Sequence, residues 1–286
     1  MQFLSSIPLV VTSALVIFSP LQEGGTTHVA QMIIRFLILA WAGGALALSI
    51  RQGRLTIPLL SVRYFVLVFL GFAVIATMFS PYAHPSRQWL FTIICYATLF
   101  YLLVSFVDRW EHVHTLTIVV VLMGVGEAAL TILQGLVWND MRPSGTFFNP
   151  NFLAGYLAVS WAILLSAAVY GYRRTAALHW LPISPTLWWF GVGASLGSLF
   201  LAVLLTQSRG GMIVVLVATV FIVMARYGWK VAGSCLVLLM VGGLLIPTPL
   251  RERVQAEHQQ NPVSYARLQM WQGALTQMAE HPLGIG

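Results

Sequence analysis

Three polar stretches of the chain carry residue types that could hold a phosphate-bearing ligand. They are Gly145-Thr-Phe-Phe-Asn-Pro-Asn151, then Ser208-Arg-Gly210, and then a C-terminal segment that contains Arg267. The planar guanidinium of arginine matches the geometry of phosphate oxygens, and the free N–H groups of a helix N-terminus attract anions. Their chemistry therefore indicates an anion site, provided that the fold brings the three stretches together.

The Asn-Pro-Asn sequence predicts a helix start. Asn149 precedes a proline, which disfavours helical backbone at Asn149. Asparagine is a favoured N-cap and proline a favoured first helical residue. We expect a helix to begin at residues 149–151, with Gly145, Thr146, Asn149 and Asn151 available to a ligand. A well-capped helix start that binds nothing is the alternative.

Arg209 lies in a short connection, residues 207–211, between two apolar runs. Gly210 and Gly211 would permit a sharp turn, which would hold Arg209 at the membrane rim with Ser208 beside it. An interfacial arginine that only extends its charge into water is the alternative.

The C-terminal segment predicts an amphipathic helix. Its apolar residues recur every three or four positions: Tyr265, Leu268, Trp271, Leu275 and Met278. This spacing is typical of a helix that lies against a membrane or a helix bundle. Arg267 lies beside the apolar stripe, and His281-Pro282 should end the helix. A plain interfacial helix with solvated charges is the alternative.

The composition predicts that lipid surrounds most of the chain. Of its 286 residues, 58% are hydrophobic and 8% are charged, whereas soluble domains carry about 25% charged residues. Helical spans need about 20 apolar residues. We therefore predict an all-α polytopic membrane bundle over residues 1–247, with the start of a periplasmic helical loop at 248–286. The nine predicted spans are 4–20, 29–50, 59–79, 88–107, 113–138, 152–170, 187–206, 211–225 and 229–247.

The loop charges predict the orientation. The formal net charge of +7 does not indicate nucleic acid here, because the basic residues lie in short gaps between apolar runs. Eight lie in even-numbered gaps, namely Arg51, Arg54, Arg63, Arg109, Arg173, Arg174, Arg226 and Lys230. Three lie in short odd-numbered gaps, namely Arg87, Arg142 and Arg209. Basic loops stay in the cytoplasm, so the N-terminus is predicted to be cytoplasmic and the three polar stretches to face outward, which for a bacterial inner membrane means the periplasm.

Two ionisable residues lie inside predicted spans, Arg35 and Glu127. A charge at the bilayer centre costs about 2.5–3.5 kcal/mol on insertion scales, so each should face the bundle interior or a water-filled cavity. We expect Arg35 to contribute to substrate binding. Glu127 is expected to be structural or cavity-lining, either protonated or paired with a basic residue or an amide. Cys95 and Cys235 lie in apolar runs, and neither a disulfide nor a metal site is expected.

Taken in order, the three stretches resemble the O-antigen ligase family, which includes O-antigen polymerases and bacterial protein oligosaccharyltransferases. The family pattern is GTF-x-NPN-x-x-A, then an SRG turn, then R-x-x-x-W and HP-x-GIG in a large periplasmic loop. The chain has Gly145–Phe147, Asn149–Asn151 with Ala154, Ser208–Gly210, Arg267 with Trp271, and His281–Gly286. The resemblance covers about residue 140 onward. Phe148 stands where the family commonly has glycine, so a less tightly turned loop is expected there.

The resemblance implies an inverting glycosyltransferase that uses no metal or cofactor. Its donor would be a glycan linked to undecaprenyl pyrophosphate, and its acceptor a hydroxyl of lipid A core, protein or glycan. Arg209 and Arg267 would be the catalytic residues that hold the pyrophosphate. In the family the loop normally continues with a histidine proposed to activate the acceptor, and further spans follow. The 286 residues contain neither, so the chain is expected to be a fragment, a truncated gene product or one part of a split protein, and neither His258 nor His281 is assigned the role of that histidine.

Two alternatives stay open at this point. One is a membrane transporter or permease subunit, in which Arg35 and Glu127 would mark a solute path. The other is a non-catalytic, truncated remnant of the ligase family.

Overall fold

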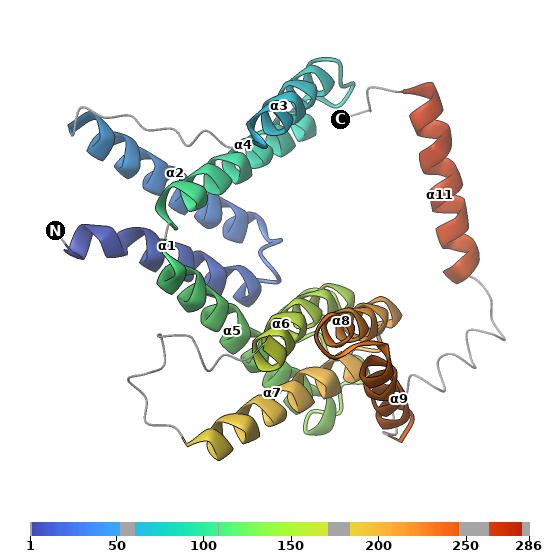
Figure 1. Ribbon diagram of the computed structural model, residues 1–286. Coiled ribbons are helices and arrows are strands. Elements are labelled where there is room, and N and C mark those ends of the chain that lie inside the picture. The colour runs from blue at the N-terminus through green and yellow to red at the C-terminus, as the bar shows by residue number, and fades with distance from the viewer. Residues whose placement is uncertain (1, 52–60, 108, 171–183, 246–262, 282–286) are drawn as a thin grey trace. The chain divides into compact units, whose positions relative to one another are not determined.

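The computed structural model describes residues 2–51, 61–107, 109–170, 184–245 and 263–281. Every regular element in these ranges is a helix (Figure 1), which confirms the all-α prediction. The helices are α1 Gln2–Leu21, α2 His28–Arg51, α3 Arg63–Met78, α4 Ala83–Phe106, α5 Trp110–Leu136, α6 Pro150–Tyr170, α7 Pro185–Leu205, α8 Arg209–Tyr227, α9 Trp229–Leu245 and α11 Val263–Glu280. Arg54, Arg173, Arg174, His258 and most of the predicted loop at 248–286 lie outside the described residues.

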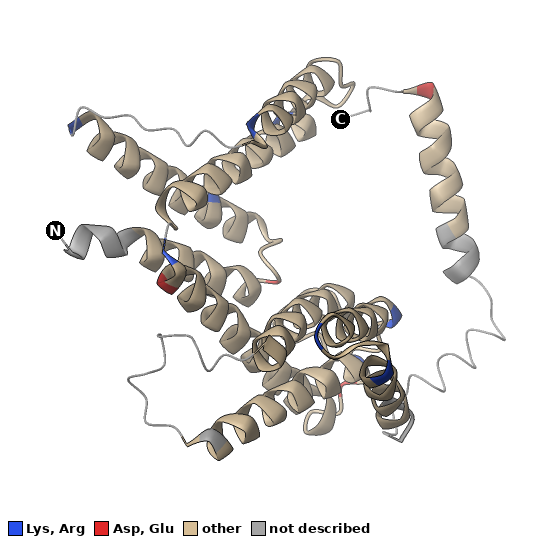
Figure 2. Cartoon of the chain, in the orientation of Figure 1, with Lys and Arg blue, Asp and Glu red and all other residues tan. Residues whose placement is uncertain are grey.

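Six of the described helices are long and apolar enough to cross a membrane: α2, α4, α5, α6, α7 and α8. The apolar parts of α1, α3 and α9 are shorter, so the nine-span count stays a prediction for those three. Large apolar side chains such as Phe65 and Phe190 are 77% and 74% exposed. Charged residues are few and lie mostly near helix ends (Figure 2). Both features fit helices whose outer surfaces face lipid.

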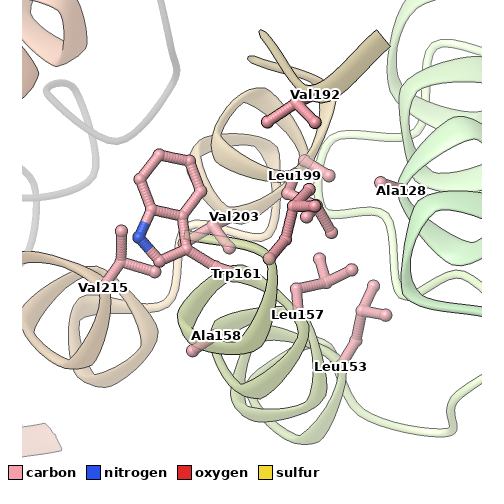
Figure 3. Close-up of a cluster of buried hydrophobic side chains, with 11 residues drawn as sticks. Ala128, Leu153, Leu157, Ala158, Trp161, Val192, Leu199, Val203 and Val215 are labelled. Atoms are coloured by element: carbon pink, nitrogen blue, oxygen red, sulfur yellow. The ribbon is translucent and has the colours of Figure 1, made fainter. Parts of the chain in front are cut away.

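The chain divides into two compact units. The first contains residues 1–11, 32–108 and 252–286, and the second contains residues 12–31 and 109–251. The second unit holds α5 to α9 and has its own apolar core (Figure 3). This core comprises Ala128, Leu153, Leu157, Ala158, Trp161, Leu164, Val192, Leu199, Ala202, Val203 and Val215. All but the first and last of these come from α6 and α7, so this pair is the centre of the unit.

Helices α6 and α8 run parallel along their length. Near their starts, a Cβ on Gly211 would lie 2.6 Å from the Cβ of Ala154. Midway, Trp161 Nε1 donates to Thr219 Oγ1 at 3.0 Å, and near their ends Tyr227 Oη donates to the Val169 carbonyl at 3.4 Å. The N-termini of the two helices therefore lie at the same end of the second unit.

Candidate functional site

The Asn-Pro-Asn sequence starts α6 as predicted. Pro150 is the first helical residue. The side-chain oxygen Asn149 Oδ1 accepts the Asn151 N–H at 2.8 Å, and the Asn149 carbonyl accepts the Phe152 and Leu153 N–H groups. The cap satisfies one of the N–H groups that every helix start leaves open.

The preceding loop, residues 144–147, is fixed by two side chains of α5. Gln134 bonds both backbone groups of Gly145, at 2.7 Å from its N–H and 2.8 Å from its carbonyl. Glu127 Oε2 accepts the Thr146 N–H at 3.0 Å, and Glu127 Oε1 lies 2.6 Å from Thr146 Oγ1. Thr146 Oγ1 also lies 2.6 Å from the Pro20 carbonyl oxygen at the end of α1. The loop is thus tied to two helices at once.

Gly145 permits this loop geometry in two ways. Its φ of +60° falls in the left-handed region, which glycine adopts without steric cost. A Cβ at this position would also collide with Glu127 Oε2. Phe148, where the family commonly has glycine, is exposed and its ring lies 5.0 Å from that of Phe152. The backbone of Gly145 and the side chain of Thr146 therefore serve the fold of the loop, and the predicted contact of these two residues with substrate stays a prediction.

The turn before α8 differs from the prediction in one respect. The connection is residues 206–208, and the turn is made by Gln207, whose φ is +54°. Gly210 and Gly211 are helical, and Gly211 allows the close approach to Ala154 described above. The prediction that the two glycines form the turn was therefore wrong: both are helical, and the missing side chain of Gly211 is used for helix packing.

Arg209 is the first residue of α8, and its side chain is exposed. Ser208 is the N-cap: it is buried, and its hydroxyl accepts the Gly211 N–H at 3.3 Å. The placement of Arg209 at the start of α8 therefore sets its charge beside the positive end of the helix dipole, where an anion rather than a cation is stabilised. Such a residue is suited to bind a ligand with several negative charges.

Arg142 links the two motifs, and sequence reasoning used it only as a loop charge. Its Nε donates to the Thr206 carbonyl at 3.2 Å and its Nη2 donates to Asn151 Oδ1 at 2.9 Å. Close by, Gln207 Nε2 donates to the Met141 carbonyl at 2.6 Å. The loop before α6 is therefore fastened to the turn before α8. The available signal in the sequence was the position of Arg142, three residues before Gly145.

The result is one end of the second unit where two helix N-termini and two arginines, Arg142 and Arg209, come together. Backbone N–H groups and guanidinium groups are donors that suit phosphate oxygens. Among the described residues, no group of three or more His, Cys, Asp or Glu side chains could hold a metal ion. The donor set of this end is that of an anion site.

Two other predicted site residues, Arg35 and Arg267, and the histidine His281 all belong to the first unit. Arg35 belongs to the first unit, where its Nη2 donates to Thr92 Oγ1 at 2.6 Å and its guanidinium lies 5.6 Å from the centre of the Phe91 ring. Arg267 falls within α11, but its side chain lies outside the described residues. His281 follows the end of α11 and is exposed. The roles predicted for Arg35 and Arg267 stay predictions.

The predicted amphipathic helix is present as α11, and its apolar residues Leu268, Trp271, Leu275 and Met278 are exposed. Cys95 is buried, Cys235 is partly buried, and both are free thiols.

A family model described as O-antigen ligase matches residues 194–286. The matched range contains Ser208–Gly210 and α11, whereas the Asn149–Asn151 helix start lies outside it and is connected to it by the contacts of Arg142 and Gly211. No curated protein and no solved structure has a significant match to the chain.

Proposed function

We propose that this chain, whose residues 194–286 match a family model described as O-antigen ligase, is a membrane glycosyltransferase that acts on a lipid-linked glycan. The donor is a glycan on undecaprenyl pyrophosphate, and the acceptor is a hydroxyl group of lipid A core, a protein or another glycan. The observation that carries the proposal is the meeting of the α6 and α8 N-termini, with Arg142 bonded to both Asn151 and the Thr206 carbonyl.

The chemistry needs such a site. The acceptor oxygen attacks the anomeric carbon, the bond from that carbon to the pyrophosphate oxygen breaks, and the acceptor hydroxyl releases its proton to a base. Attack from the face opposite the leaving group inverts the anomeric centre. Negative charge grows on the departing pyrophosphate, and donors fixed beforehand at a lipid–water boundary stabilise that charge most where the dielectric constant is low. Arg209 and the N–H groups at the starts of α6 and α8 supply such donors, and the resemblance to the family implies the same role for Arg267.

Transport of a solute is the competing function, and the hydrogen bonds of Arg35 and Glu127 argue against it. A transport path would use Arg35 and Glu127 as ligands inside the membrane. In the structure Arg35 bonds Thr92, and Glu127 bonds the loop that precedes α6. Both side chains therefore hold helices or loops in place.

The test compares two arginines at opposite ends of one helix. Arg209→Ala should lower the rate of glycan transfer by about 10²–10³-fold, the usual cost of losing one donor to a developing anion. Arg226, at the C-terminal end of α8, is also exposed, so Arg226→Ala should leave the rate unchanged. The assay uses the purified full chain in liposomes with a polyprenyl-pyrophosphate-linked fluorescent disaccharide and a hydroxyl acceptor.

Arg267→Ala should behave as Arg209→Ala in the same assay. If Arg209→Ala and Arg267→Ala both transferred glycan at the wild-type rate, the roles given to Arg209 and Arg267 would be refuted. Uptake of a labelled solute by the same liposomes, without transfer, would favour the transporter instead.

A further inference from the structure

A buried acid that the proposed chemistry does not use fixes the loop in front of α6. Glu127 is 3% exposed and lies in the C-terminal half of α5, a helix long and apolar enough to cross the membrane. Within the described residues, the partners of its carboxyl group are neutral: the N–H and the hydroxyl group of Thr146. Its backbone carbonyl accepts the Thr131 hydroxyl at 2.6 Å.

The hydrogen bonds around Thr146 require one more proton than the threonine can supply. Its oxygen Oγ1 lies 2.6 Å from Glu127 Oε1 and 2.6 Å from the Pro20 carbonyl oxygen. Both distances are at the short end of the range for O–H···O bonds. A hydroxyl has one proton, and a backbone carbonyl can only accept. If the Glu127 carboxyl were ionised, one of these two short contacts would join two acceptors.

A protonated Glu127 satisfies the Thr146 hydroxyl, the Thr146 N–H and the Pro20 carbonyl together. Its Oε1–H donates to Thr146 Oγ1, the Thr146 hydroxyl donates to the Pro20 carbonyl, and Oε2 accepts the Thr146 N–H. An ionised and unpaired carboxylate in a buried site would also carry a large desolvation cost. These hydrogen bonds then join α5, the loop before α6 and the end of α1. Just after α1, the backbone of Glu23 also forms an isolated β-bridge with Phe147.

We propose that Glu127 carries its proton in the folded protein at neutral pH, and that it is a positioning residue that sets the loop of residues 144–147, and through it the start of α6. The assignment of the proton stands on the geometry alone. Its consequence for glycan transfer rests on the proposed function.

The first test is spectroscopic. The infrared spectrum of the purified full chain at neutral pH should contain the carbonyl stretch of a protonated carboxyl group. This band should be absent from Glu127→Gln and should shift in Thr146→Val, which removes its hydrogen-bond partner. A wild-type spectrum that contains no such band, or a band that persists in Glu127→Gln, would overturn the assignment.

The second test compares a substitution that keeps the hydrogen-bond donor and acceptor of a protonated Glu127 with one that removes both. The amide of Glu127→Gln can donate to Thr146 Oγ1 and accept the Thr146 N–H, so its melting temperature should equal that of wild type and transfer should stay within about twofold. Glu127→Ala leaves buried polar groups unsatisfied, so it should melt earlier and lose about tenfold or more in transfer, a loss equivalent to 1.4 kcal/mol.

The Thr146 pair keeps this test decisive if Glu127→Ala does not fold. Thr146→Ser retains the hydroxyl and should melt at the wild-type temperature, whereas Thr146→Val should melt as early as Glu127→Ala. A Glu127→Gln protein as defective as Glu127→Ala would show that an ionised carboxylate is required. If the wild-type chain transferred no glycan at all, the proposed function would fail while the infrared and melting results still decided the state of Glu127.

Discussion

At the scale of single residues, Arg142 shows how one side chain can hold two motifs together. Its Nε and Nη2 atoms reach two acceptors on different segments, the Thr206 carbonyl and Asn151 Oδ1. A guanidinium can bond two acceptors in fixed directions, whereas the ammonium of lysine is a single point charge on a flexible stem. The contact therefore depends on the shape of arginine as well as on its charge.

We expect Arg142→Lys to lower both stability and transfer. Loss of one bond leaves a partly buried acceptor poorly satisfied, which costs about 1–3 kcal/mol. Arg87, exposed in the first unit and bonded to the Ala83 carbonyl of its own helix, is a matched control, and Arg87→Lys should change neither quantity. Melting curves and the transfer assay decide the matter, and a neutral Arg142→Lys would mean that the two motifs are held together without it.

At the scale of elements, the packing of α6 on α8 depends on one of two adjacent glycines. A Cβ on Gly211 would lie 2.6 Å from that of Ala154, whereas a Cβ on Gly210 would meet nothing within 4 Å. Small residues at such crossings let helix backbones approach closely in a membrane. The first turns of both helices, which carry the site, are thereby brought side by side.

Substitution of the two glycines by alanine should have opposite effects. Gly211→Ala forces the helices apart, at a cost of about 1–3 kcal/mol for overpacking, and the melting temperature should fall. Gly210→Ala, in an open helical position, should stabilise by about 0.5–1 kcal/mol. The double variant Gly211→Ala with Ala154→Gly restores the space and should recover most of the loss. Equal melting of the two single variants would contradict the close approach.

The elements themselves could be predicted from the sequence, but their contacts could not. Apolar runs of about 20 residues and the cap at Asn149 are local signals, and the helices follow them. The pairing of Glu127 with Thr146 joins residues on different elements, and no periodicity marks it. Gly210-Gly211 shows why such contacts could not be predicted. Two adjacent glycines are equally compatible with a turn and with a close crossing of two helices, and only the position of Ala154 in the fold distinguishes these possibilities.

At the scale of the whole molecule, the membrane orientation decides on which face the site works. The structure places the starts of α6 and α8 at one end of the second unit, and Lys230 follows the opposite end of α8. The charge count predicts that the first end is periplasmic, because basic loops stay in the cytoplasm. A lipid-linked donor presented in the periplasm could be reached only in this orientation.

We expect single cysteines at the two ends to be labelled from opposite sides. In a chain whose native cysteines are replaced, Cys95→Ala with Cys235→Ala, exposed Phe148→Cys should react with a membrane-impermeant maleimide on intact spheroplasts. Lys230→Cys, also exposed, should react only after the membrane is permeabilised. The reverse labelling would put the arginines of the site in the cytoplasm and exclude a periplasmic donor, whereas labelling of both from outside would show that α8 does not cross the bilayer.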